Sequence, residues 1–185
     1  MTTAATTKNS KTLDMVYIAM FAVLIAICSW ISIPTMVPFT LQTFGIFVTV
    51  GILGGKRGSL SVLIYLLLGA IGVPVFAGFS GGIQALVGTT GGYIIGFLLS
   101  ALLMWGMEKL LGRKTWVLAL SMVLGLVVCY AFGTVWFMEV YAKNSGEIGL
   151  MTALGWCVFP FIIPDVIKIA LALLLTKTIT RVVKI

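Results

Sequence analysis

Asp165 and Lys168 place opposite charges three residues apart inside residues 150–176, a segment otherwise apolar and long enough to cross a bilayer. An ionised side chain in hydrocarbon costs about 2.5–3.5 kcal/mol on insertion scales, so such residues usually face a bundle interior, a partner or a ligand. Positions i and i+3 share one face of a helix. The pair would therefore present a hydrogen-bond acceptor beside a donor, which suits a small polar ligand with both kinds of group.

Two other interpretations of this pair stay open at this point. The charges could neutralise each other between helices as a purely structural pair, or Asp165 could be the protonation site of a proton-coupled secondary transporter. Catalysis is disfavoured because the chain has no histidine, no paired cysteine site and no second carboxylate at membrane depth. We expect no enzyme, no metal site and no disulfide, since Cys28, Cys129 and Cys157 lack any paired spacing.

The composition is that of an integral membrane protein. Hydrophobic residues make up 61% of the 185, charged residues 9%, and the mean hydropathy is +1.19. At about 30 residues for each span and its loop, the length allows roughly six helices and leaves no room for a soluble domain. We therefore expect an all-α membrane protein with a cytoplasmic tail, residues 1–14, and one six-helix transmembrane domain, residues 15–185.

The basic residues indicate the orientation of the chain. The formal net charge is +7, but the lysines and arginines gather at alternate ends of the apolar runs, as the positive-inside rule requires. This pattern predicts a multi-pass cell-membrane protein with both termini in the cytoplasm, and it disfavours nucleic acid as a partner. The residues on the predicted inner side are Lys8, Lys11, Lys56, Arg57, Lys109, Arg113, Lys114, Lys177, Arg181 and Lys184.

The same charges separate spans from loops. A seventh span at residues 74–90 would move the basic residues after it to the outside, so we interpret this glycine-rich stretch as an outer loop or re-entrant cap. Irregular backbone at membrane depth is tolerated only where it is buried or lines a cavity. Asp165 would lie about 16–18 Å above the inner interface at 1.5 Å per residue, so the pocket should open outward beneath the outer loops. The predicted spans are residues 15–33, 39–53, 59–73, 91–107, 116–138 and 150–176, with a further polar outer loop at 139–149.

Three other motifs are weaker signals. "PFTLQTFG" places Thr40, Gln42 and Thr43 at the start of the second span, where they could contact a ligand or simply cap a helix. "GTTGGYIIGF" places Gly91 and Gly92 beside Tyr93, a pattern for close approach to a ligand or for ordinary helix packing. A strip of small residues on the first span would dock a partner if it faces outward and pack this bundle if it faces inward: Ala19, Ala22, Ala26 and Ser29.

Taken together and in this order, "VPFTLQTFG", "GAIGVPVFAGFSGG", "GTTGGYIIGF" and "IPDVIKIALA" resemble the BioY family. These are the biotin-specific S-components of energy-coupling factor (ECF) transporters, and the resemblance covers nearly the whole chain. It implies high-affinity capture of biotin from outside and uptake with a transmembrane coupling subunit and two cytoplasmic ATPase subunits. The chain has no P-loop of its own, because "GGKRGS" lacks the required spacing. Gln84 departs from the small residue expected in the glycine-rich loop.

The resemblance also implies roles for the residues singled out above. Asp165 would accept from a ureido N–H of biotin, and Lys168 would donate to the ureido oxygen or pair with the valerate carboxylate. Biotin would be the transported substrate, with no cofactor, and an S-component for another vitamin is the nearest alternative. The Ala19, Ala22 and Ala26 strip resembles the family's docking motif for the coupling subunit. The remaining predicted wall and lid residues are Gln42, Thr43, Gly91, Gly92, Tyr93, Phe39 and Phe79.

Overall fold

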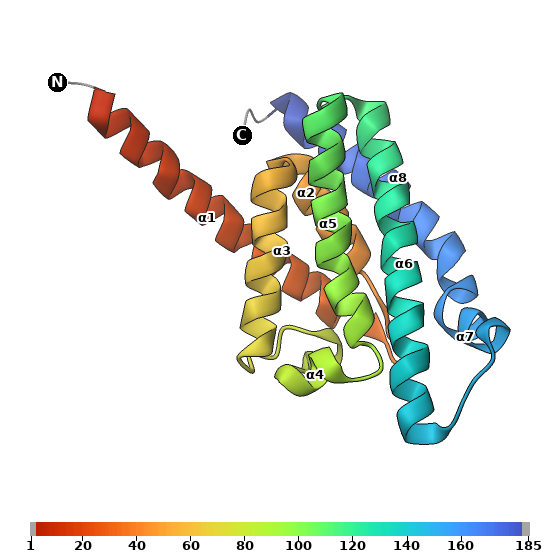
Figure 1. Cartoon of the computed structure of the whole chain (residues 1–185). Coiled ribbons are helices and arrows are strands. Elements are labelled where there is room, and N and C mark those ends of the chain that lie inside the picture. Colours follow the sequence, from red (N-terminus) through yellow and green to blue (C-terminus); the bar gives the residue numbers. More distant parts are fainter. Residues whose placement is uncertain (1–2, 183–185) are drawn as a thin grey trace.

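The structure is a computed structural model that describes residues 3–182. Within them the chain forms a helical bundle with one very short antiparallel hairpin, in which Ser32 pairs with Thr40 and Ile33 with Phe39. Figure 1 shows the long helices packed side by side, with α1 leaving the bundle at a steep angle. The elements are α1 (Thr3–Trp30), β1 (Ser32–Ile33), β2 (Phe39–Thr40), α2 (Gln42–Leu53), α3 (Gly55–Ala70), a 3₁₀ turn (Ala77–Phe79), α4 (Ile83–Val87), α5 (Gly91–Leu111), α6 (Thr115–Ser145), α7 (Leu150–Cys157) and α8 (Phe159–Val182).

Helix α2 is the centre of the bundle. Ten of its twelve residues are buried, and it packs against α1, α3, α5 and α8. At 1.5 Å per residue it is only about 18 Å long, well short of a hydrocarbon core of about 30 Å. Its ends therefore lie inside the protein, where other elements surround the backbone groups that hydrocarbon would leave unsatisfied.

The turn between α2 and α3 is tighter than the predicted turn at residues 54–58. Gly54 alone reverses the chain, with a φ of +81° that favours glycine. Helix α3 then starts at Gly55, where a side chain would collide with the Trp105 backbone because its Cβ would lie 2.4 Å from the Trp105 Cα. The basic residues of this segment, Lys56 and Arg57, consequently belong to the first turn of α3.

Two helices are longer than predicted. Helix α1 begins at Thr3 and not at Met15, so residues 3–14 of the predicted tail are helical, while residues 1–2 lie outside the described part. Helix α6 continues to Ser145 and not only to Met138, so the predicted polar loop shortens to residues 146–149. Polar residues such as Glu139 and Lys143 are good helix formers, and the helix ends only where Gly146 adopts a φ of +99°.

The predicted sixth span is divided into two helices. Helix α7 ends at Cys157, Val158 leaves helical geometry with φ −127° and ψ −57°, and α8 begins at Phe159. Pro160 accounts for the break, because it has no N–H for the carbonyl of Trp156 four residues earlier and its ring would clash with that carbonyl, whereas a proline is tolerated in the first turn of a new helix. Pro164 lies inside α8, one residue before Asp165, and cannot donate a backbone hydrogen bond there.

Four segments of the described residues are long and apolar enough to cross a membrane: Lys11–Trp30, Gly91–Leu111, Thr115–Ser145 and Leu150–Val182. The last combines α7 and α8. Helix α2 is apolar but shorter. The chain therefore has the helical content and the apolar surface of a multi-pass membrane protein, although its second and third helices are shorter than a typical span.

Candidate ligand-binding site

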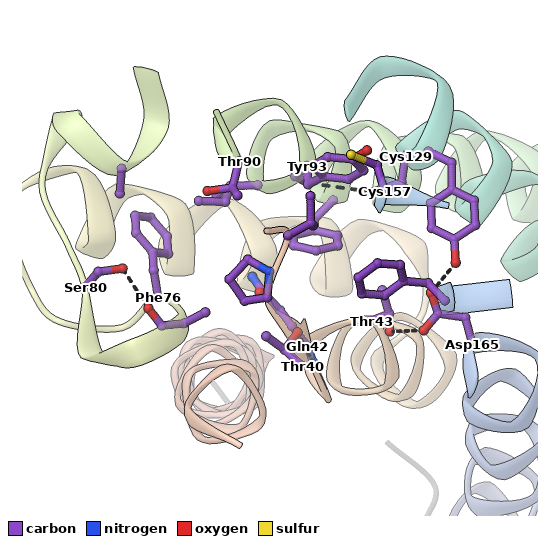
Figure 2. A pocket seen from close by; sticks show the side chains of 18 of the residues that line it. Thr40, Gln42, Thr43, Phe76, Ser80, Thr90, Tyr93, Cys129, Cys157 and Asp165 are labelled. Atoms are coloured by element: carbon purple, nitrogen blue, oxygen red, sulfur yellow. Dashed lines mark hydrogen bonds between the residues drawn. The ribbon is translucent and has the colours of Figure 1, made fainter. Parts of the chain in front are cut away.

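A cavity of about 170 Å³ lies where the N-terminal parts of α2, α5 and α8 meet the middle of α6. The segment between α3 and α5, residues 71–90, forms part of its wall; we call it the cap segment. Figure 2 shows side chains from these elements converging on one space. The lining residues are Val37, Pro38, Thr40, Gln42, Thr43, Phe76, Ala77, Ser80, Ala85, Thr90, Tyr93, Ile94, Phe97, Cys129, Tyr130, Cys157, Phe161, Asp165 and Lys168.

The charged pair forms one end of this cavity. Lys168 Nζ lies 2.7 Å from Asp165 Oδ1, and the two residues are only 5% and 2% exposed. The ammonium also donates to the carbonyl oxygen of Thr40 at 2.7 Å and lies 4.2 Å from the centroid of the Phe39 ring. A hydrogen-bonded partner, a carbonyl and an aromatic face thus compensate the burial of the lysine charge.

The carboxylate of Asp165 accepts from three protein donors. Thr43 donates to Oδ1 at 3.1 Å, Lys168 donates to the same oxygen, and the Tyr130 hydroxyl donates to Oδ2. Figure 2 shows the dashed contacts to Asp165 from two sides. A carboxylate offers about four lone-pair sites. Three are used, so one acceptor site remains, and it belongs to Oδ2.

Gln42 adds a second group with spare hydrogen-bonding capacity. Its side-chain nitrogen donates to the Tyr65 hydroxyl at 2.8 Å, across from α3. Within the described residues its amide oxygen has no hydrogen-bond partner, and Gln42 lines the cavity. Because Tyr65 is fully buried, this contact fixes the Gln42 amide in place and leaves its oxygen available to accept from a ligand.

The rest of the cavity is mainly apolar and includes four aromatic rings. Phe76, Tyr93, Phe97 and Phe161 contribute rings to the lining, and two cysteine thiols lie between them. The Tyr93 hydroxyl is bonded to the Thr134 hydroxyl at 2.9 Å, so the tyrosine is fixed from behind. The site therefore combines a charged, hydrogen-bonding end with an apolar slot, as expected for a ligand that has a polar head and an apolar body.

The cap segment is held in place by tryptophans on two helices. Trp30 Nε1 donates to the carbonyl of Pro74 at 2.8 Å, and Trp136 Nε1 donates to the carbonyl of Gly88 at 3.0 Å. The Trp30 ring also stacks on Phe79 with centroids 5.1 Å apart. These contacts join both ends of the cap segment to α1 and α6, while residues between them line the cavity.

Comparison with known proteins identifies the family. The sequence pattern of the BioY family matches residues 1–185. The biotin transporter BioY of Thermotoga maritima is 40% identical over 169 residues, covering 91% of this chain and 96% of that protein. A probable biotin transporter BioY of Pyrococcus horikoshii is 40% identical over 168 residues, covering 90% and 96%. The chain belongs to the BioY family.

A solved structure agrees with this assignment. The crystal structure of the S-component for biotin from an ECF-type ABC transporter matches with a TM-score of 0.82 at 30% identity, over 94% of this chain and 93% of that chain. The similarity therefore extends over nearly all of the fold. With its several apolar helices, this BioY-family chain is a multi-pass membrane protein.

Several of the predicted site residues meet in this BioY fold. The predicted residues Asp165, Lys168, Gln42, Thr43 and Tyr93 line the same cavity, although they come from three helices. Phe39 lies just behind this lining, where its ring covers Lys168 and stacks on Phe161 at 5.8 Å. Phe39 and Thr40 belong to β2 and not to the second helix, and Thr40 contacts the lysine through its backbone carbonyl.

Three other predicted residues do not line the cavity. A Cβ on Gly91 would lie 1.8 Å from the Leu86 carbonyl oxygen, and one on Gly92 would lie 2.2 Å from Trp136 Cβ, so both glycines allow close packing. Phe79 is 63% exposed on the outer surface of the cap segment. Its positive φ of 56° is unusual for a residue with a side chain.

The strip of small residues on α1 faces mainly inward. Ala22 and Ala26 are 2% and 4% exposed, and Ser29 is also buried, with its hydroxyl donating to the carbonyl of Val75. Ala19 is exposed. Two of the three alanines predicted to dock a partner thus pack against this chain's own bundle, and the docking role of the strip stays a prediction.

Sequence reasoning missed Tyr130 and the aromatic wall. Tyr130 lies in the middle of a long apolar helix, and its only sequence signal is a hydroxyl at membrane depth. Phe76, Phe97 and Phe161 have no signal that separates them from ordinary core residues. Only the packing of α5, α6, α8 and the cap segment shows that these side chains line one cavity with Asp165.

Proposed function

We propose that this protein captures biotin with high affinity from outside the cell and takes it up as the S-component of an ECF transporter. The observation that supports this most directly is the buried Asp165–Lys168 pair at the end of an aromatic cavity, in a chain of the BioY family. Biotin has the matching chemistry: a ureido ring with two N–H donors and one carbonyl, and an apolar ring and tail that end in a carboxylate.

We propose a six-span topology with both termini in the cytoplasm. The spans would be α1, α2, α3, α5, α6 and the α7–α8 pair. Lys56 and Arg57 at the start of α3, Arg113 and Lys114 before α6, and Lys177 near the end of α8 would then lie on the inner side. The starts of α3 and α6 and the end of α8 lie at the same end of the bundle (Figure 1), so this orientation agrees with the positive-inside rule. The cap segment would then face outward.

In this proposal the ureido group of biotin binds at the charged end. One N–H would donate to the remaining acceptor site on Asp165 Oδ2, beside Tyr130. The ureido oxygen would face the ammonium of Lys168, whose third proton points at no oxygen in the described residues. Gln42 would complete the polar end, and Phe76, Tyr93, Phe97 and Phe161 would flank the apolar rings. The valerate tail would then extend toward Ser80 and Thr90 of the cap segment.

Energy for uptake would come from partner subunits. The sequence lacks a P-loop, so ATP would act through a coupling subunit and two cytoplasmic ATPase subunits. The S-component for biotin that this fold resembles comes from an ECF-type ABC transporter. Uptake should therefore depend on the ATPase subunits. Uptake that persists without them and stops when the proton gradient is removed would favour the proton-coupled alternative.

Calorimetric titration of the purified, ligand-depleted protein with biotin tests the proposal, with thiamin and riboflavin as controls. We expect one-to-one binding of biotin alone. No biotin binding by demonstrably folded protein would reject the proposal, and selective binding of thiamin or riboflavin would identify an S-component for another vitamin.

A second titration separates the two assignments of Lys168. Biotinamide keeps the ureido ring of biotin but replaces the carboxylate with a neutral amide. If Lys168 faces the ureido oxygen, then Lys168→Met should weaken biotin and biotinamide by the same factor. If Lys168 pairs with the valerate carboxylate, biotinamide should already bind weakly to the unmodified protein, and Lys168→Met should weaken only biotin.

A further inference from the structure

A second cavity lies at the other end of the bundle from the biotin site. It has a volume of about 350 Å³ and is enclosed by the end of α2, the start of α6 and the second half of α8. In Figure 1 this part of α8 passes behind α5 and α6, close to the end where α6 begins. Its lining residues are Gly51, Ile52, Arg113, Lys114, Thr115, Leu118, Leu173, Thr176, Lys177 and Thr180.

The lining is strongly basic. It contains Arg113, Lys114 and Lys177 and includes no aspartate or glutamate. Arg113 is fixed in place, because its Nη2 donates to the carbonyl oxygens of Gly51 and Ile52 at 2.8 and 2.6 Å. Among the side chains described, those of residues 11–182, the ion pairs are Arg57–Asp14 and Lys168–Asp165, so Lys114 and Lys177 have no acidic partner there. This cavity is therefore suited to an anion.

Two further groups have unused hydrogen-bonding capacity at the same cavity. Helix α6 starts here, and its N-cap residue Lys114 makes no side-chain capping bond, so first-turn N–H groups lack a protein acceptor. The hydroxyl of Thr176 has no hydrogen-bond partner although the residue is only 4% exposed. A phosphate oxygen at the start of α6 would supply an acceptor for the free N–H groups, whereas the Thr176 hydroxyl is packed against Gly51.

The remaining lining indicates a lipid as the source of this anion. Leu118 and Leu173 lie one helical turn deeper along α6 and α8 than Lys114 and Lys177. Trp116, in the first turn of α6, is 56% exposed, as is usual for an aromatic residue at the membrane interface. The basic groups are thus at headgroup level, with apolar side chains where an acyl chain would begin. A free phosphate ion would leave those leucines without a contact.

We propose that this cavity binds the phosphate group of an anionic phospholipid from the inner leaflet. Lys114 and Lys177 would contact the phosphate together with the first turn of α6, and Leu118 and Leu173 would contact the upper acyl chain. Basic pockets between membrane helices are known to bind such headgroups. This inference does not depend on the assignment of biotin as the substrate.

Native mass spectrometry of the delipidated protein tests the proposal. The protein would be incubated with equal amounts of phosphatidylglycerol and phosphatidylcholine with identical acyl chains. We expect one phosphatidylglycerol per chain to be retained in preference. Lys114→Gln with Lys177→Gln should reduce this preference by roughly fivefold per lysine, or roughly 30-fold in all. The matched control is Lys56→Gln with Lys109→Gln, which removes two charges at the same end but outside this cavity, and it should keep the preference.

The control pair and a competition with inorganic phosphate distinguish a built lipid site from general attraction. Equal loss in the control pair, or equal retention of both lipids by the unmodified protein, would overturn the proposal. Inorganic phosphate that competes fully with phosphatidylglycerol would overturn the lipid as the source. Melting temperatures verify that each variant is folded.

Discussion

Neutralising the buried pair one residue at a time, and then together, separates its structural role from its binding role. Asp165→Asn removes the charge that compensates Lys168, which would remain 5% exposed with a carbonyl and an aromatic face as neighbours. Breaking a buried pair in this way costs about 3–5 kcal/mol of stability. Lys168→Met should cost a similar amount, because it leaves the carboxylate with only two hydroxyl donors.

The double variant Asp165→Asn with Lys168→Met should behave differently. It buries no charge, the asparagine keeps its contacts to Thr43 and Tyr130, and methionine fills most of the volume of the lysine stem. Replacing both members of a buried ion pair with neutral residues is often neutral or stabilising, so we expect most of the lost stability to return. Biotin binding should not return, because the ligand loses charge-assisted hydrogen bonds worth about 1.5–3 kcal/mol each, or roughly 10- to 150-fold in affinity.

Thermal unfolding in detergent and calorimetric titration with biotin would be measured on all four proteins. A double variant that is stable and binds biotin as tightly as the unmodified chain would refute the reasoning, because the pair would then be structural only. Single variants that unfold at the unmodified temperature would show that the two charges are not coupled in the folded protein.

Three further substitutions test other contacts. Tyr130→Phe removes one donor from the Asp165 carboxylate and should weaken biotin binding roughly tenfold or more in a calorimetric titration; unchanged affinity would contradict its role in orienting the carboxylate. Gly92→Ala places a Cβ against the neighbouring tryptophan of α6 and should cost about 1–3 kcal/mol in thermal unfolding, whereas Gly149→Ala, with no atom within 4 Å, should change little; equal effects would refute the packing argument. If the cap segment is drawn into the membrane during uptake, Phe79→Asp should reduce uptake more than Phe79→Ala, because entry of a carboxylate into hydrocarbon costs about 2.5–3.5 kcal/mol; equal uptake by the two variants would show that this exposed residue stays outside during transport.

The parts of the fold that follow from membrane physics could be predicted from sequence. Apolar runs and charge placement gave the order of the long helices and the loop status of the cap segment, because hydrocarbon penalises charge and irregular backbone. The ends of the helices were harder to predict from the sequence. Helix α6 runs past Met138 into polar residues, because the membrane boundary does not by itself end a helix. The helix ends at Ser145, before Gly146. A break near Val158 could have been predicted from Pro160, which cannot bond to the carbonyl four residues earlier and therefore interrupts a continuous helix.

Site residues could be predicted where their chemistry is unusual for a membrane helix, and they were missed where their residue type is common there. A charge at membrane depth is conspicuous, so Asp165 and Lys168 could be identified from residue types alone. The pair Gly91 and Gly92 is also unusual for a helix start, but its role is packing and not ligand binding: the glycines let α5 approach Trp136 and the cap segment closely. Tyr130 has no unusual spacing, and its importance depends on the rotation of α6 relative to α8, which the sequence does not specify.

The contacts around Asp165 also indicate where binding energy must come from. In the arrangement described here, both charges are already compensated by protein groups, with three donors on the carboxylate and two acceptors on the ammonium. A ligand therefore does not compensate an unpaired charge, and it adds few hydrogen bonds at the polar end. Each such bond to a charged group contributes about 1.5–3 kcal/mol net, because the ligand gives up water to form it. Most of the affinity must then come from burial of apolar surface against the aromatic wall and the cap segment, while the charged end selects which head group can enter.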